Sequence, residues 1–215
     1  MFGTNDKKLI SYFRKKLISW ELDNFAAFPW RFCQNKWHSL AVEIMLQRTK
    51  AEQVLPVFED FCKRYPEPEL YYRDTDANIF NSLGLQQRNR EFKLLAKELS
   101  IKDIPESKEL LLQLPGVGEY VASAYLSLHR NKRAVIIDSN VVRLYGRFFG
   151  FGTDGETRRK KWFIELAGNL TPVRNFYYFN YGLLDLPRNL CKIKPDCNRC
   201  PLKKKCKYYN TVNVV

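Results

Sequence analysis

The sequence has no apolar run long enough to cross a membrane, because charged residues interrupt every such run well before about 18 residues. Its first eight residues contain no apolar stretch of the kind that a secretory signal requires. It also has no lipidation signal, internal repeat or low-complexity tract. These absences exclude membrane-spanning, secreted and repeat proteins. They predict a cytoplasmic protein, associated with the nucleoid if its source is prokaryotic.

Acidic residues are few compared with basic ones. The chain has 23 Asp and Glu against 36 Lys and Arg, which gives a formal net charge of +13. A polyanionic partner is therefore expected, although an ordinary basic protein has the same excess of charge. With 45% hydrophobic and 14% aromatic residues in 215 positions, the chain can bury one large core or two small ones.

Histidine is scarce, with two residues, and cysteine is unevenly distributed. Cys33 and Cys62 are isolated, whereas the last four cysteines follow the pattern C-x5-C-x2-C-x5-C at Cys191, Cys197, Cys200 and Cys206. A disulfide framework would be spread through a smaller, secreted chain. Four close thiolates with no intervening histidine predict either a [4Fe–4S] cluster or a zinc ion, and the single CxxC between two wider loops favours the cluster. Six lysines in this segment either balance its negative charge or bind phosphate: Lys192, Lys194, Lys203, Lys204, Lys205 and Lys207.

Strand patterns are nearly absent, and the apolar residues follow helical spacing instead. The spacing predicts an all-α protein with helices at 8–20, 37–65 (as two helices), 76–83, 88–99, 105–112, 118–128, 139–149, 158–170 and 175–186. The short apolar run 135–137 is expected to be an extended entry to the helix at 139–149. Gly84 is expected to end the helix at 76–83.

A glycine-containing hairpin, Leu114-Pro-Gly116-Val117-Gly118, lies between two predicted helices. Proline ends the first helix, and the glycines permit positive φ and a close backbone approach. Val117 is expected to fill the space between the two helices. The free N–H groups at the start of the second helix can bind one DNA phosphate, although a bare turn between helices has the same residues.

Three motifs occur in order: LPGVGEYVA at 114–122, VIIDSNVVR at 135–143 and the four clustered cysteines. Together they resemble the helix-hairpin-helix DNA glycosylases of the endonuclease III and MutY branch. FPWR at 28–31 and EIMLQRT at 43–49 are similar to MutY and to the thymine/uracil–guanine mismatch glycosylases. The resemblance implies a two-lobed fold, with a six-helix barrel at 27–131 and a cluster domain built from 1–26 and 132–215. It also implies a monomer that binds double-stranded DNA.

The resemblance implies that Asp138 stabilises the positive charge that develops on the deoxyribose when the N-glycosidic bond breaks. An aspartate ahead of Ser-Asn is also a common helix N-cap, and Asp138 is able to do both. Tyr120 stands where bifunctional relatives carry a Schiff-base lysine, which indicates hydrolysis without strand cleavage. Tyr120 is expected to contact the flipped nucleotide or orient the attacking water, unless it is a core tyrosine.

Further roles come from the same resemblance. Glu43 matches the glutamate that protonates the base or positions water, although a carboxylate on such a helix is often solvent-facing. Gln47, Arg48 and Thr49 match the loop that enters the duplex, where Arg48 suits the carbonyl face of an orphaned guanine. Leu85 is the expected wedge on the opposite strand. The remaining implied DNA contacts are Leu114, Gly116, Val117, Gly118 and Asn140.

Thymine or uracil opposite guanine is the expected target. Arg48 and the segment FNYGLLD at 179–185 are similar to the mismatch glycosylases. MutY enzymes carry an extra C-terminal domain, whereas this sequence ends nine residues after Cys206. Adenine opposite guanine or 8-oxoguanine is the alternative target. A non-catalytic DNA-binding module is a further alternative, but it would not need Asp138, Tyr120 and Glu43 together.

Overall fold

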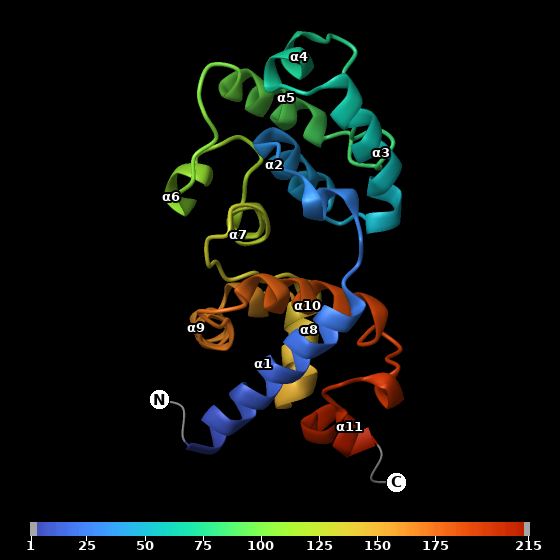
Figure 1. Cartoon of the computed structure of the whole chain (residues 1–215), viewed down its shortest axis with the longest axis vertical. Coiled ribbons are helices and arrows are strands. Elements are labelled where there is room, and N and C mark those ends of the chain that lie inside the picture. The colour runs from blue at the N-terminus through green and yellow to red at the C-terminus, as the bar shows by residue number, and fades with distance from the viewer. Residues whose placement is uncertain (1–3, 213–215) are drawn as a thin grey trace. The chain divides into compact units, whose positions relative to one another are not determined.

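The computed structural model describes residues 4–212, and the regular structure in this range is helical throughout, with no strand (Figure 1). The all-α prediction is therefore confirmed. No helix of residues 4–212 has the length and apolar character needed to span a membrane. The chain divides into two compact units: unit 1 comprises Met1–Ala26 and Arg133–Val215, and unit 2 comprises Ala27–Lys132.

Unit 1 is built around a long N-terminal helix that packs along α10, which packs in turn on α8. The helix α1 presents Ile10, Phe13 and Leu17 to the core, as its apolar spacing predicts. Gly182 allows the close approach of α10, since a Cβ there would lie 2.9 Å from Leu17 Cγ. The helices of this unit are α1 (Thr4–Asn24), α8 (Ser139–Phe149), α9 (Lys161–Leu170), α10 (Phe176–Asn189) and α11 (Lys207–Val212).

Unit 2 is built around an aromatic core. Trp37 stacks on Phe92 with ring centroids 5.0 Å apart, and Phe61 packs against both rings. The helices of this unit are α2 (Lys36–Met45), α3 (Ala51–Arg64), α4 (Pro68–Arg73), α5 (Arg88–Leu99), α6 (Lys108–Leu111) and α7 (Glu119–Ala124). A wide π-helical turn, Tyr125–His129, continues α7.

Two predicted helices have the observed bounds, α5 and α8. The helix α8 begins after Asp138, whose side chain accepts a hydrogen bond from Val141 N, and it ends before Gly150 at φ +75°. Both are the signals by which a sequence marks helix ends. The helix predicted at 158–170 begins later, at Lys161, and ends at Leu170 as predicted. The one predicted at 175–186 extends to Asn189, and the one predicted at 105–112 is shorter because Ser107 caps it at Lys108.

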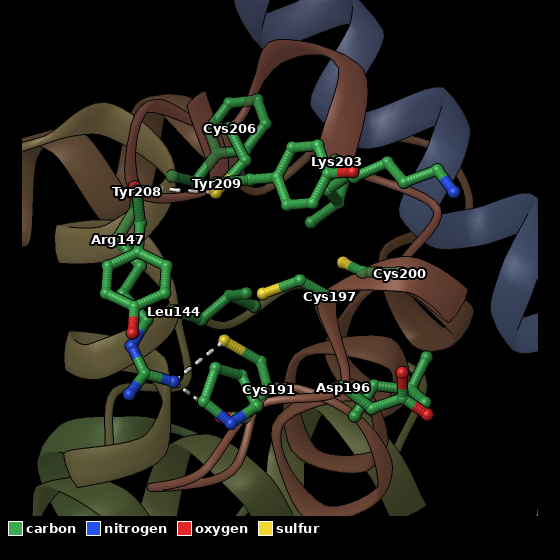
Figure 2. A pocket seen from close by; sticks show the side chains of 14 residues that line it. Leu144, Arg147, Cys191, Asp196, Cys197, Cys200, Lys203, Cys206, Tyr208 and Tyr209 are labelled. Carbon is green, nitrogen blue, oxygen red and sulfur yellow. Dashed lines mark hydrogen bonds between the residues drawn. The ribbon is translucent and has the colours of Figure 1, made fainter. Parts of the chain in front are cut away.

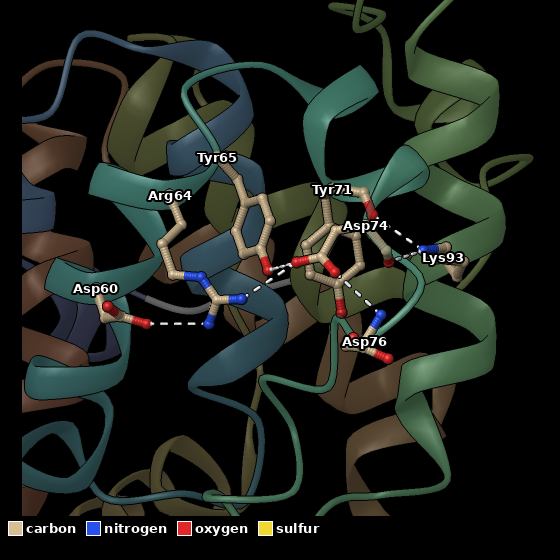
Figure 3. A network of polar contacts seen from close by, with 7 residues as sticks. All are labelled: Asp60, Arg64, Tyr65, Tyr71, Asp74, Asp76 and Lys93. Atoms are coloured by element: carbon tan, nitrogen blue, oxygen red, sulfur yellow. Dashed lines mark hydrogen bonds and ion pairs between the residues drawn. The ribbon is translucent and has the colours of Figure 1, made fainter.

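The helix predicted at 76–83 is wrong: these residues form turns, and a short helix, α4, precedes them instead. Pro68 lies in the first turn of α4, where its missing N–H costs nothing. After α4, Asp74 Oδ1 accepts a hydrogen bond from Asp76 N, and Tyr65 donates to Asp74 Oδ2 at 2.5 Å (Figure 3). The bond from Asp76 N to the Asp74 side chain competes with helical hydrogen bonds. Gly84 has φ +69°, but it ends a turn rather than a helix.

His38 makes the stability of unit 2 sensitive to acid. Its side chain is buried on α2 and its Nε2 donates to Tyr65 O at 2.9 Å. Burial lowers the pKa of His38 below 6.5, so the folded protein binds a proton at this ring more weakly than the unfolded chain does. The free energy of unfolding should therefore fall as the pH drops below about 6.5 towards the folded-state pKa.

Urea unfolding at pH 7.5 and at pH 5.5 measures this effect. The loss of stability between the two pH values should be smaller in His38→Gln than in the wild type, because glutamine keeps a donor for Tyr65 O but does not titrate. An equal loss in both proteins would contradict a buried neutral His38.

Candidate active site and cysteine pocket

Asp138 lies at the N-terminus of α8, which fixes both of its oxygens. Oδ1 accepts from Val141 N at 2.7 Å, and Oδ2 accepts from the amide of Asn140 at 2.9 Å. Asp138 is therefore an N-cap, as the sequence allows, and Asn140 orients it. The carboxylate is only partly exposed, and the loss of water around it raises its pKa despite these hydrogen bonds. A poorly hydrated carboxylate interacts strongly with a nearby positive charge.

Glu43 lies on α2 and is buried, with 2% of its side chain exposed. Its Oε1 lies 2.8 Å from Nε2 of His129, which is also 2% exposed. Its Oε2 is buried with no hydrogen-bond partner. Glu43 is thus not the solvent-facing carboxylate that its helix would suggest. His129 binds one oxygen of the Glu43 carboxylate, and the other oxygen, Oε2, makes no hydrogen bond.

The loop Gln47–Thr49 follows α2 directly. Arg48 is exposed and adopts a left-handed conformation with φ +63°, which is uncommon for a residue with a side chain. Backbone strain of this kind is found at functional sites, where surrounding contacts maintain it. Arg88 supports the loop from α5, because its Nη1 donates to Ile44 O at 2.8 Å near the end of α2. Burial, and next Arg48, lower the pKa of Arg88.

The hairpin and this loop share a pocket within unit 2. The pocket is lined by Ile44, Gln47, Arg88, Glu91, Phe92, Pro115 and Gly116. Gly116 has φ +73°, and Gly118 is the exposed N-cap of α7. Leu114 and Val117 are buried beneath the turn. The structure therefore brings two segments that the sequence assigns to DNA contact to the same pocket.

Two other predicted residues have different environments. Leu85 is 8% exposed, and its N–H donates to Phe80 O at 2.8 Å, so its side chain packs inside unit 2 in this conformation. Tyr120 lies in the first turn of α7 and is half-buried rather than a fully buried core residue. Both assigned roles, the wedge and the contact to the flipped nucleotide, stay predictions.

The four C-terminal cysteines line one pocket in unit 1. Figure 2 shows the sulfurs of Cys191, Cys197 and Cys200 directed towards that space. Burial first, and then the charges of the three other thiols, raise the pKa of Cys200 to about 12. Among residues 4–212, however, no group of three or more His, Cys, Asp or Glu side chains is arranged to hold a metal ion.

Two arginines of α8 hold the loop that begins at Cys191. Arg143 Nε donates to Cys191 O at 2.9 Å. Arg147 donates to Cys191 Sγ at 3.5 Å and to Ile193 O at 3.0 Å, while its guanidinium lies 4.8 Å from the ring centroid of Tyr208 (Figure 2). One helix thus carries Asp138 at its start and grips the cysteine loop further along.

The sequence did not single out His129, Arg88 or Arg147. Arg143 appeared in a motif without a role, and the hydrophobic run before His129 gave no sign that this residue faces Glu43. The two histidines among 215 residues were a usable signal, because a rare titratable residue beside a glycosylase-like hairpin merits inspection.

Comparison with known proteins relates the chain to DNA glycosylases, although no family model matches it. It is 35% identical to the thymine-DNA glycosylase of Aeropyrum pernix, over 95% of this chain and 97% of that protein. It is 33% identical to the thymine/uracil-DNA glycosylase of Methanothermobacter thermautotrophicus, over 96% of each. An adenine DNA glycosylase of Buchnera aphidicola is 32% identical over 84% of this chain, but the match spans 53% of that protein.

Solved structures agree with these relatives. A thermostable thymine-DNA glycosylase superposes with a TM-score of 0.87 at 30% identity, covering 95% of this chain and 98% of the other. Endonuclease III, in a trapped covalent complex with DNA, superposes with a TM-score of 0.83 over 99% of both chains at 20% identity, which shows a shared fold. Near-complete coverage at this identity, together with the fold, establishes that the chain belongs to the thymine/uracil-DNA glycosylase family.

Proposed function

We propose that the protein is a monofunctional glycosylase of base excision repair that removes thymine or uracil paired with guanine from duplex DNA. The observation that carries this assignment is the near full-length likeness to thymine- and thymine/uracil-DNA glycosylases. Arg48 supports the same target, because an exposed guanidinium beside the duplex can bind the carbonyl and N7 edge of the orphaned guanine. The reaction leaves an abasic site and the free base.

Asp138 is the group that we assign to the sugar. As the N-glycosidic bond breaks, positive charge develops on the deoxyribose, and a fixed, poorly hydrated carboxylate stabilises it without reorganising. The bonds from Val141 N and Asn140 hold that carboxylate in place. Tyr120, which cannot form an imine, supports hydrolysis instead of a lyase reaction.

Glu43 is the group that we assign to the base or the attacking water. It acts through Oε2, the oxygen with no partner, either by giving a proton to the leaving base or by orienting the water. Extrusion of the base requires that the protein bind the DNA backbone and that a side chain fill the gap left in the duplex. We assign the first task to backbone N–H groups after Gly118, and the second to Arg48 with Gln47 and Thr49.

The cysteine pocket is proposed to hold a [4Fe–4S] cluster through Cys191, Cys197, Cys200 and Cys206. A cubane cluster takes a thiolate at each of four corners, and these four cysteines line one pocket, with a single CxxC between two wider loops. When bound, the cluster would cross-link the C-terminal loops. Exposed lysines around it, such as Lys192 and Lys204, are available to phosphates. Because these ligands must be reduced thiols, we place the enzyme in the cytoplasm.

Excision assays on a panel of duplexes test the target and the reaction. Under single-turnover conditions, duplexes with T or U opposite G should break at the target only after alkali, because hydrolysis leaves an intact backbone. The matched duplex with T opposite A should stay whole, since its thymine remains stacked and paired.

Other outcomes of the same assay would contradict the proposal. Cleavage only of A opposite G or 8-oxoguanine would assign the enzyme to the adenine glycosylases, a second candidate that the Buchnera relative supports. Strand breaks without alkali, with an adduct trapped by borohydride, would overturn the monofunctional reaction.

A further inference from the structure

A buried carboxylate–imidazole pair connects α2 to the segment that follows α7. Glu43 Oε1 and His129 Nε2 lie 2.8 Å apart, and each side chain is 2% exposed. In such a site a hydrogen bond involving a charged group is strong, and leaving either partner alone is costly. The pair therefore fixes the position and rotation of the Glu43 carboxylate.

The backbone after α7 places His129 in this position. The residues Tyr125–His129 form a π-helical turn, which adds one residue to the helical register and changes the direction of the side chains that follow. Tyr125 stacks on the imidazole with centroids 6.4 Å apart, and its own hydroxyl is buried without a hydrogen-bond partner. The imidazole is thus supported on one face by packing and on one edge by Glu43.

The two oxygens of Glu43 differ sharply. Oε1 is bound to His129, whereas Oε2 is buried with no hydrogen-bond partner. An unsatisfied buried oxygen costs free energy, and native proteins keep few of them without a reason. Among the described residues, His129 is the group whose hydrogen bond decides which oxygen of Glu43 stays unpaired.

We propose that His129 is a positioning residue for excision: its Nε2–H holds Oε1 of Glu43, so that Oε2 is presented to the base or water. This role rests on the proposed glycosylase function, in which Glu43 is the acid or water-orienting group. No proton passes from His129 to the substrate. Its contribution is the orientation of a carboxylate that would otherwise rotate in its pocket.

Variants that keep or remove the donor test this role. His129→Leu should lower the single-turnover excision rate about 10- to 100-fold while the affinity for abasic-site product DNA changes less than about threefold, because orientation affects the chemical step. His129→Gln keeps an N–H donor and should recover most of the rate. His38→Gln is the matched control. It replaces the other histidine of the chain, which is buried on α2 and bonds to Tyr65 O, not to Glu43. A wild-type rate in His129→Leu, or equal rates in His129→Leu and a folded His129→Gln, would overturn the role.

A measurement independent of activity separates this inference from the proposed function. With two histidines in the chain, a ¹⁵N-histidine spectrum contains two imidazoles, and His38→Gln assigns them. The Nε2 of His129 should be protonated, with a slowly exchanging N–H signal that shifts in Glu43→Gln. An unprotonated Nε2 would overturn the inference even if the enzyme is active. A protonated Nε2 in a protein inert on every duplex would instead contradict the proposed function and leave the hydrogen bond established.

Discussion

Asp138→Asn should lower the excision rate at least about 100-fold, which corresponds to about 2.7 kcal/mol of transition-state stabilisation. Asparagine has the shape of aspartate, and its oxygen can still accept from Val141 N, which lies 2.7 Å from Oδ1 in the wild type. The variant therefore keeps the cap of α8, and it loses the negative charge and the acceptor for the side-chain amide of Asn140. Single-turnover excision on a duplex with U opposite G measures the loss.

The same variant should be more stable than the wild type at pH 7. Burial raises the pKa of Asp138, which means that the folded protein binds this proton more tightly than the unfolded chain. Ionised Asp138 thus lowers the free energy of unfolding at neutral pH, and the wild type recovers this loss as the pH falls through the raised pKa towards 3.8. Urea unfolding should show an advantage for Asp138→Asn that is largest at pH 7 and shrinks in acid.

Asp154, in the same unit, provides a control because its pKa is shifted in the opposite direction from that of Asp138. Lys160, first, and Thr157 lower the pKa of its exposed carboxyl to about 2, so ionised Asp154 stabilises the fold above the unfolded-state pKa. Asp154→Asn should lose stability at pH 7 and keep its excision rate. If Asp138→Asn instead lost stability as Asp154→Asn does, its loss of activity would reflect damage to α8. Full activity in a stable Asp138→Asn would exclude Asp138 from catalysis.

The helices that the sequence predicts well are those whose ends are marked locally. Asp138 and Gly150 mark α8 within the sequence itself, because an N-cap and a left-handed glycine act on adjacent backbone groups. The failure at 76–83 has a tertiary cause. There the side-chain amide of Asn89, on α5, accepts a hydrogen bond from Phe80 N and donates one to Asn81 Oδ1, and no local pattern encodes these contacts.

The candidate site divides in the same way. Asp138 and Glu43 were predicted from the resemblance of their motifs to a known family, and the cysteines were predicted from their spacing. The burial of Glu43 and its bond to His129 were not, because they depend on a π-helical turn that shifts the register before His129. A continuous helix, which the apolar spacing favours, would direct His129 elsewhere. The hydrogen-bond partners of a proposed catalytic residue can therefore be identified only from the structure, even where the residue itself is predicted from the sequence.

Cys200→Ser should abolish the cluster and destabilise unit 1. The wild type is expected to absorb near about 400 nm and to contain iron and sulfide, and the variant should lose both. Because a bound metal centre contributes its binding energy to folding, the melting temperature should fall by about 10 °C or more. Cys62→Ser is the matched control, since this cysteine lies in unit 2, where burial raises the pKa of its thiol to about 12.

The loss in Cys200→Ser should extend to catalysis through α8. Arg143 and Arg147 bind the carbonyl groups of Cys191 and Ile193, so the cysteine loop is attached to the helix whose first turn holds Asp138. Releasing the loop frees that helix to shift, and excision should fall together with stability. If the wild-type protein is colourless and contains zinc, the site is a zinc ion bound by four thiolates and not an iron–sulfur cluster. Unchanged stability and colour in Cys200→Ser would exclude Cys200 as a ligand of any metal centre.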